Sequence, residues 1–237
     1  LNLIINNREH FNVLGVSCNS NIDKLLNIAQ EFECNNLGIN DEKKITNYPR
    51  LKDFIVHAGL DEFSKLMNNN VDIVIFAIAG SSALNLLIDL LSSGKIIGIA
   101  NKECIICLGK TLLDIASESS TEIIPLDSEH NALFQLMKNK NRDSIRKYII
   151  TASGGSFFNL SKSEMEKITP DQAISHPKWK MGKKISVDSS TLMNKGLEII
   201  EACILFDINS NKIDAVIHPE SIIHGMIEFN DRSSHAF

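Results

Sequence analysis

Short apolar runs alternate with amphipathic segments along the first half of the sequence, and this alternation constrains the fold more than any other feature. The predominantly apolar runs 71–79, 96–100 and 122–126 predict buried strands. Leucine and isoleucine at helical spacing over 84–91 predict a helix between the first two strands. Strands and helices that alternate in this way build a parallel sheet covered by helices. We therefore expect an α/β fold with a Rossmann-like parallel sheet.

The pattern changes after residue 127, where polar segments separate short strands from one long helix. Strands are expected at 147–152, 184–187, 215–217 and 222–229, and the helix at 191–206. We expect the last two strands to be antiparallel, in a sheet with one exposed face. The sequence thus predicts two domains, residues 1–126 with α/β architecture and residues 127–237 with α+β architecture.

Charge and composition exclude several classes of protein. The formal net charge is −5 and the basic residues are scattered, so no basic stripe suits nucleic acid. The longest strictly apolar run, 73–79, is far shorter than a membrane span. The 5 cysteines are irregularly spaced, which favours a reducing compartment over a disulfide framework. We expect Cys104 and Cys107 to be core thiols at the start of a helix, because the sequence holds no second Cys-x-x-Cys pair.

Two carboxylates follow the strand predicted at 122–126. Asp127 and Glu129 are two residues apart, so in an extended chain their side chains point the same way. The end of a parallel strand is the usual place for a site in an α/β protein. Two converging carboxylates suit a hard divalent cation such as Mg²⁺ or Mn²⁺. The alternative is a solvated loop in which Asp127 or Ser128 caps the next helix.

A second cluster of polar residues lies at the start of the long predicted helix. Asn194 and Lys195 share one helical face with Glu198, which could supply a third carboxylate to the metal. We expect Ser189 and Ser190 to occupy the N-cap region, so that hydroxyls, an amide and a lysine form a phosphate cradle. The alternative is a capping pair followed by a Lys–Glu pair on the surface.

Three weaker motifs lie in polar loops. The strand at 147–152 runs into Ser153-Gly154-Gly155, a common kind of turn whose backbone amides can approach an anion. The loop 175–183 holds the single tryptophan, Trp179, which suits either a lid over a ligand or an anchor to the core. The segment 101–103 follows a strand at the edge where α/β sheets bind ligands. The sequence contains no Gly-x-Gly-x-x-Gly nucleotide fingerprint.

Six segments occur together in a specific order and spacing. They are 100–103, 125–130, 151–155, 176–182, 184–198 and 218–224. This combination resembles the 1-deoxy-D-xylulose 5-phosphate reductoisomerase family, from about residue 13 to the end and most densely over 96–229. The resemblance implies that residues 1–126 are an NADPH-binding domain and residues 127–237 a catalytic and metal-binding domain.

The resemblance also implies an activity. Members of the family are oxidoreductases of non-mevalonate isoprenoid biosynthesis, and they rearrange and reduce 1-deoxy-D-xylulose 5-phosphate to 2-C-methyl-D-erythritol 4-phosphate. They use NADPH together with Mg²⁺ or Mn²⁺. A small sugar phosphate is therefore the expected partner, and a homodimer the expected assembly. The expected location is the cytoplasm of a bacterium, or a plastid in a eukaryote that has one.

Individual residues take expected roles from the same resemblance. The metal ligands are Asp127, Glu129 and Glu198. The substrate-binding residues are Ser128, Glu129, Ser153, His176, Trp179, Met181, Ser189, Asn194, Lys195 and Glu198, of which Trp179 and Met181 belong to the lid. The nucleotide-binding residues are Asn101, Glu103 and Gly182. The catalytic residues are Lys102, Glu129 and His176, and His130 and His224 match histidines near the site.

The sequence departs from the family pattern in two respects. It lacks the N-terminal glycine-rich nucleotide loop and the C-terminal helical domain, so we expect a fragment that is inactive alone. It also has Cys104, Ser156 and Lys178 where serine, proline and asparagine are usual. Two alternatives stay open: a non-catalytic fragment that binds metal and sugar phosphate, and a metal-dependent aldolase or isomerase that uses no nucleotide.

Overall fold

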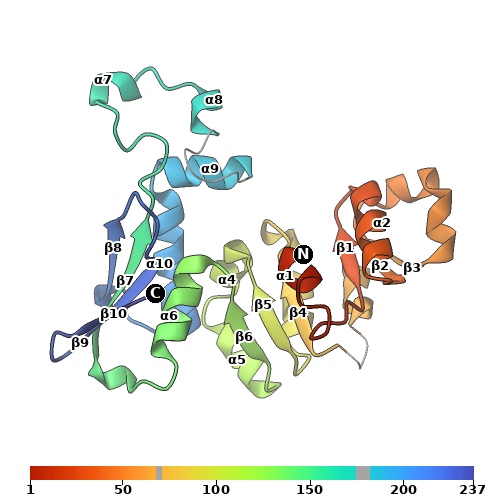
Figure 1. Ribbon diagram of the computed structural model, residues 1–237, viewed down its shortest axis with the longest axis horizontal. Coiled ribbons are helices and arrows are strands. Elements are labelled where there is room, and N and C mark those ends of the chain that lie inside the picture. Colours follow the sequence, from red (N-terminus) through yellow and green to blue (C-terminus); the bar gives the residue numbers. More distant parts are fainter. Residues whose placement is uncertain (68–70, 175–181) are drawn as a thin grey trace. The chain divides into compact units, whose positions relative to one another are not determined.

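The computed structural model describes residues 1–67, 71–174 and 182–237 (Figure 1). The chain divides into two compact units whose segments interleave along the sequence. The first unit comprises Leu1–Ile75, Ser81–Ile97 and Ile115–Glu122, and the second comprises Phe76–Gly80, Gly98–Asp114 and Ile123–Phe237. The predicted domain boundary between residues 126 and 127 stays a prediction.

The first unit contains a parallel sheet with the strand order β1-β2-β3. Its strands are β1 (Val16–Cys18), β2 (Asn36–Ile39) and β3 (Ile55–Ala58). Helix α2 (Ile22–Glu31) follows β1 and begins where the Asn21 side chain accepts a hydrogen bond from the Lys24 amide, at 3.1 Å. Its buried face, at the helical spacing predicted from the sequence, packs into one core with β2.

A second parallel sheet has the order β4-β5-β6, with β4 (Ile73–Phe76), β5 (Ile96–Ile99) and β6 (Glu122–Pro125). At its carboxyl end the Ala100 amide donates to Phe76 at 2.9 Å, and the Leu126 amide donates to Ile99 at 2.8 Å. Both bonds lie within the second unit. The parallel-sheet class predicted from the sequence is therefore confirmed, with the described strands in two sheets of three rather than in one.

Helices alternate with these strands. They are α1 (Asn2–Ile5), α3 (Leu84–Leu91), α4 (Lys102–Leu108), α5 (Thr111–Glu118) and α6 (Ser128–Met137). Short 3-10 turns are η1 (Glu42–Asn47), η2 (Pro49–Asp53), η3 (Leu60–Leu66), η4 (Ser81–Ala83), η5 (Arg142–Ser144) and η6 (Ser210–Lys212). Helices α4 and α6 start directly after β5 and β6, so their first residues lie at the carboxyl ends of neighbouring strands.

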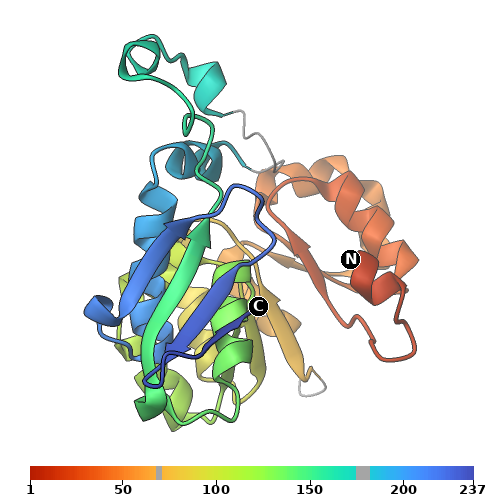
Figure 2. The same cartoon turned by 60° about the vertical axis from the view of Figure 1, so that its left-hand side comes forward.

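The second unit contains a mixed sheet with the order β10-β9-β7-β8. Its strands are β7 (Ile145–Ala152), β8 (Ile213–Ile217), β9 (Gly225–Phe229) and β10 (Ser234–Ala236). Helices α6 and α10 (Met193–Phe206) lie against one face of this sheet (Figure 2). They share a buried core with β7, β8 and β9, which includes Leu133, Tyr148, Phe206, Ile213 and Ile227. Packing in this core fixes the relative positions of α6, α10 and β7, and polar residues lie at one end of each of these elements.

The last two predicted strands run in opposite directions, as expected, but they are not neighbours in the sheet. Strand β9 runs antiparallel to β7, whereas β8 runs parallel to β7. A long connection that includes α10 joins β7 to β8, and such crossovers return the chain in its original direction. The two last predicted strands are therefore not paired with each other, because β7 lies between them.

The segment 184–187 is helical, so the strand predicted there is wrong. It belongs to α9 (Lys183–Ser190), which follows the short helices α7 (Lys162–Met165) and α8 (Pro170–Ala173). Contacts between residues four apart support the helix: Ser186 Oγ donates to the Gly182 carbonyl at 3.0 Å, and Lys184 pairs with Asp188 at 2.7 Å. Alternating polarity over four residues is too short to separate strand from helix.

Two smaller expectations are also wrong. Ser189 and Ser190 end α9 instead of capping the long helix, whose N-cap is Leu192 with a left-handed φ of 60°. Cys104 is buried as expected, but Cys107 is exposed, because residues three apart on α4 need not share its buried face. Among the described residues, no helix is long and apolar enough to cross a bilayer.

Candidate functional site

Two neighbouring strand ends bring the first pair of site residues together. Lys102 opens α4 after β5, and Asp127 is the N-cap residue of α6 after β6. The Lys102 Nζ lies 2.8 Å from Asp127 Oδ2 and 3.3 Å from Glu198 Oε1, and donates to Asn194 Oδ1 at 2.9 Å. The Asp127 side chain makes no cap hydrogen bond, so the alternative of a simple capping residue does not describe it.

Helix α10 supplies the opposite wall of the site. Lys195 Nζ lies 2.9 Å from Glu129 Oε1 and also contacts Glu198 Oε2. The Glu198 carboxylate is only 3% exposed and lies between the two ammonium groups of Lys102 and Lys195. Ser128 Oγ donates to the remaining Glu129 oxygen at 2.7 Å. The predicted Lys–Glu pair is therefore part of a buried network, not of the surface.

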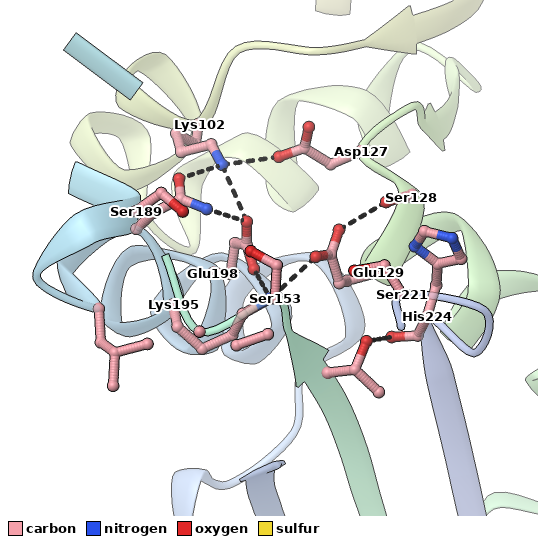
Figure 3. A pocket seen from close by; sticks show the side chains of 15 residues that line it. Lys102, Asp127, Ser128, Glu129, Ser153, Ser189, Lys195, Glu198, Ser221 and His224 are labelled. Atoms are coloured by element: carbon pink, nitrogen blue, oxygen red, sulfur yellow. Dashed lines mark hydrogen bonds and ion pairs between the residues drawn. The ribbon is translucent and has the colours of Figure 1, made fainter. Parts of the chain in front are cut away.

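These residues line one cavity of about 320 Å³ in the second unit, which is large enough for a small phosphorylated ligand (Figure 3). The lining includes the three predicted metal ligands and four residues predicted at the phosphate, Ser153, Ser189, Asn194 and Lys195, together with Lys102, Ser128 and His224. Ser190 and Gly155, also predicted near an anion, are not part of this lining. Ser153 reaches the cavity from the carboxyl end of β7, and Ser189 from the end of α9. The lining residues extend from Lys102 to His224 in the sequence, so local spacing alone could not bring them together; the core that α6, α10 and β7 share does so.

The ion pairs shift the pKa values of Lys102 and Glu129. Burial alone would lower the pKa of Lys102, but the Glu198 and Asp127 carboxylates outweigh it and raise that pKa well above its usual range. Burial alone would raise the pKa of Glu129, but the Lys195 ammonium outweighs it and lowers that pKa. At neutral pH Lys102 is therefore a cationic donor, and Glu129 is a carboxylate.

The formal charge of the cluster favours binding of a cation first and of an anion second. Three carboxylates and two ammonium groups leave a formal charge of about −1, which attracts a divalent cation and repels a phosphate. The carboxylates of Asp127, Glu129 and Glu198 offer only oxygen ligands, the donors that Mg²⁺ and Mn²⁺ prefer. Once a divalent cation is bound the formal charge becomes about +1, which attracts a phosphate.

The residues predicted to contact the nucleotide do not line this cavity. Asn101 is buried and its side chain is already engaged: its Oδ1 accepts from the Cys104 amide at 2.6 Å and its Nδ2 donates to the Gly80 carbonyl at 2.9 Å. Glu103 pairs with Lys184 at 3.2 Å, and Gly182 is the exposed N-cap of α9. Their roles in nucleotide binding stay predictions.

The predicted lid residues His176, Trp179 and Met181 lie outside the described residues. Their roles in binding and catalysis also stay predictions.

A buried pair beneath the cavity was not predicted from the sequence. His130 on α6 and Glu201 on α10 are 0% and 2% exposed, and His130 Nδ1 faces Glu201 Oε2 at 3.4 Å. Burial, with the Asp127 carboxylate, raises the pKa of Glu201 to about 9, and burial lowers the pKa of His130. The one feature of the sequence that could have predicted this pair is Glu201 itself, a carboxylate three residues after Glu198 in a mostly apolar helix.

The turn after β7 depends on a glycine. Gly155 has a φ of +73°, and a Cβ there would lie 2.4 Å from the Ser189 carbonyl oxygen and 2.8 Å from Ser190 Cα. We expect Gly155→Ala to lower the free energy of unfolding by about 3 kcal/mol, because the cost of a positive φ adds to the cost of the clash with the Ser189 and Ser190 backbone. Urea unfolding measures this change in the free energy of unfolding. In the matched Gly196→Ala, a Cβ would lie within 4 Å of no described residue outside its own helical turn, so this change should not destabilise. Equal stability of both variants would contradict the close approach at Gly155.

Two family models match the chain. One, described as 1-deoxy-D-xylulose 5-phosphate reductoisomerase, matches residues 1–109, and the other, described as the C-terminal domain of the same enzyme, matches residues 123–206. Relatives named 1-deoxy-D-xylulose 5-phosphate reductoisomerase include that of Wolbachia pipientis from Culex pipiens, 44% identical over 100% of this chain and 61% of its own length. That of Nitrobacter hamburgensis is 38% identical over 94% of this chain and 56% of its own length.

Solved structures agree with these matches. The reductoisomerase from Zymomonas mobilis in complex with NADPH has a TM-score of 0.88 and 36% identity, over 99% of this chain and 62% of that one. A DOX-P reductoisomerase with NADPH, fosmidomycin and magnesium has a TM-score of 0.86 and 34% identity, over 98% of this chain and 61% of that one. The chain thus spans about 60% of the length of the relatives it matches.

Proposed function

Because this chain belongs to the 1-deoxy-D-xylulose 5-phosphate reductoisomerase family, we propose that its cavity binds a divalent metal and 1-deoxy-D-xylulose 5-phosphate, for NADPH-dependent conversion to 2-C-methyl-D-erythritol 4-phosphate. The observation that carries the proposal is the single cavity in which Asp127, Glu129 and Glu198 meet Lys102 and Lys195. It supports the assignment of a metal next to a phosphate.

The three carboxylates would hold Mg²⁺ or Mn²⁺. Asp127 and Glu198 share the Lys102 ammonium, and Glu129 and Glu198 share that of Lys195. Among the described residues these three carboxylates do not form a group with all ligand atoms within 4.8 Å, so their side chains would have to turn toward a common cation. The match to a structure named as a magnesium complex supports this choice of metal. A bound divalent cation polarises a substrate carbonyl and stabilises the negative charge that develops on its oxygen.

Lys102 would act on the substrate as a hydrogen-bond donor. Its Nζ lies beside Asp127 and Glu198, so it can reach an oxygen of a substrate held at these carboxylates. Because its pKa is raised, it remains protonated and does not serve as a general base in this state. It stabilises charge that develops on the substrate oxygen. Ser128 fixes one oxygen of Glu129, which leaves the other to face the cavity.

The phosphate group of the substrate would lie against Lys195, Asn194, Ser153 and Ser189. All four line the cavity and supply hydrogen-bond donors from three separate segments. Lys195 supplies the positive charge, since its ammonium is free to move to the phosphate once a metal satisfies Glu129 and Glu198. NADPH supplies the hydride; Asn101, Glu103 and Gly182 remain the residues we propose for its binding.

The assay for this function uses the complete protein that carries these residues, with 1-deoxy-D-xylulose 5-phosphate, Mn²⁺ and NADPH. We expect NADPH oxidation and 2-C-methyl-D-erythritol 4-phosphate, identified by mass spectrometry, only when all three are present. Product that forms without NADPH would indicate an aldolase or isomerase instead. Binding of metal and substrate without turnover would indicate the non-catalytic role. The homodimer and the cytoplasmic or plastid location also remain proposals; light scattering tests the first.

A further inference from the structure

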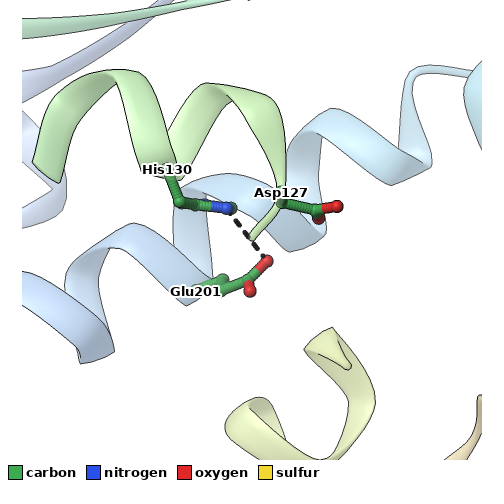
Figure 4. Close-up of side chains that lie close together, drawn as sticks. All are labelled: Asp127, His130 and Glu201. Atoms are coloured by element: carbon green, nitrogen blue, oxygen red, sulfur yellow. Dashed lines mark ion pairs between the residues drawn. The ribbon is translucent and has the colours of Figure 1, made fainter. Parts of the chain in front are cut away.

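The His130–Glu201 pair has no role in the function proposed above. His130 Nδ1 and Glu201 Oε2 face each other at 3.4 Å, and neither makes a hydrogen bond with another residue in the described part of the chain (Figure 4). Both side chains are buried almost completely. Burying polar groups in such surroundings lowers the free energy of unfolding unless the groups interact with each other. The pair is therefore a specific feature of the interface between α6 and α10.

The other nitrogen of His130 shows what the pair holds in place. His130 Nε2 lies 2.9 Å from the backbone carbonyl oxygen of Glu198. A carbonyl oxygen only accepts, so Nε2 carries the hydrogen and Nδ1 is the nitrogen that faces Glu201. The imidazole thus connects α6 to the backbone of α10 at Glu198, and Glu201 contacts the side of the ring that would otherwise be unsupported.

We propose that Glu201 is a positioning residue, which orients His130 so that its ring fixes the distance between Glu129 on α6 and Glu198 on α10. His130 follows Glu129 directly in α6, and its hydrogen bond ends on Glu198 itself. The inference rests on the proposed metal site, because fixing these two carboxylates matters only if they bind one ion. Partners that orient metal ligands in this way set metal affinity without touching the metal.

A competing interpretation is that Glu201 is itself a metal ligand. Ligand atoms of Asp127, His130 and Glu201 lie within 4.8 Å of one another, so they could surround an ion. Two geometric observations favour positioning. The Asp127 carboxylate is directed to the Lys102 ammonium at 2.8 Å, and the His130 ring is held by its hydrogen bond to the Glu198 carbonyl at 2.9 Å, with Glu201 facing the other ring nitrogen at 3.4 Å. The number of Mn²⁺ ions bound separates the two interpretations.

The test compares Glu201→Gln with Glu201→Leu in the complete protein. The glutamine amide can donate to His130 Nδ1, whereas leucine of similar size cannot. Calorimetric titration with Mn²⁺ should give one ion per chain for both variants. We expect affinity within about threefold of the unchanged protein for glutamine, and weaker by about 10- to 100-fold for leucine. The electron paramagnetic resonance spectrum of bound Mn²⁺ should change for leucine alone. If the leucine variant does not fold, Glu201→Ala takes its place.

Two further variants make the result decisive. In a His130→Gln background, Glu201→Leu should cause no additional loss of Mn²⁺ affinity, because Glu201 acts through His130. Asp127→Asn tests the metal site itself, and normal Mn²⁺ binding there would refute the proposed function rather than this inference. Unchanged Mn²⁺ affinity and spectrum in both Glu201 variants would overturn the positioning role. Loss of one of two bound ions would instead make Glu201 a ligand.

Discussion

Replacing Glu198 with glutamine is expected to eliminate measurable Mn²⁺ binding and to lower turnover by about a thousandfold or more. The Glu198 carboxylate is 3% exposed and contacts both Lys102 and Lys195. Removing one negative charge about 4 Å from a divalent cation costs about 4 kcal/mol or more, which corresponds to about a thousandfold. The cluster would also change from a formal charge of about −1 to about 0, so it would no longer attract a cation.

Calorimetric titration measures the affinity for Mn²⁺, and urea unfolding measures the stability of the same variant. Two ammonium groups lose an ionised partner, so the free energy of unfolding should also fall by about 3 kcal/mol. Glu118→Gln is the matched control: the same change of charge at an exposed position should alter neither quantity. Normal Mn²⁺ affinity in a folded Glu198→Gln protein would show that Glu198 is not a ligand.

Replacing Lys195 with methionine is expected to move two affinities in opposite directions. Lys195 competes with the metal for Glu129 and Glu198, so its removal should strengthen Mn²⁺ binding by roughly tenfold. The same change removes the charged donor to the phosphate, so affinity for 1-deoxy-D-xylulose 5-phosphate at saturating Mn²⁺ should fall by about 100-fold. A damaged fold cannot produce this combination, because it would weaken both.

Successive calorimetric titrations, first with Mn²⁺ and then with substrate, measure the two affinities on one sample. Lys140→Met is the matched control, because it removes an exposed lysine in the loop after α6 and should change neither affinity. If Lys195→Met weakens Mn²⁺ binding, then Lys195 supports the carboxylates rather than competing for them. If substrate affinity is unchanged, another group holds the phosphate.

The parts of the site that could be predicted are those set by local geometry. The helical spacing of Asn194, Lys195 and Glu198 correctly predicted one polar cluster on α10. The cluster proposed for Asp127 and Glu129 assumed an extended chain, which is wrong because Glu129 lies in the first turn of α6. Parallel strands end at one edge of a sheet, so Lys102 and Asp127 could be expected near each other. The structure brings both clusters into one cavity, although the ligand roles of these residues remain to be tested.

Other features depend on contacts that spacing does not report. The segment 184–187 alternates like a strand, yet it is helical in α9. The direction of β8 follows from the crossover through α10, not from its own residues. The contact between His130 and Glu201 joins two helices separated by more than 50 residues, and nothing near either residue in the sequence predicts that they meet. Tertiary packing decides each of these cases.

The central claim is that Asp127, Glu129 and Glu198 bind one metal ion in the cavity and release Lys195 for the phosphate. Crystals of the complete protein soaked in Mn²⁺ test it directly, through the anomalous difference map recorded near the manganese absorption edge. The account predicts one strong peak among these three carboxylates, with Lys195 Nζ turned away from Glu129. A peak among Asp127, His130 and Glu201 instead, or Lys195 still paired with Glu129 beside a bound ion, would contradict it.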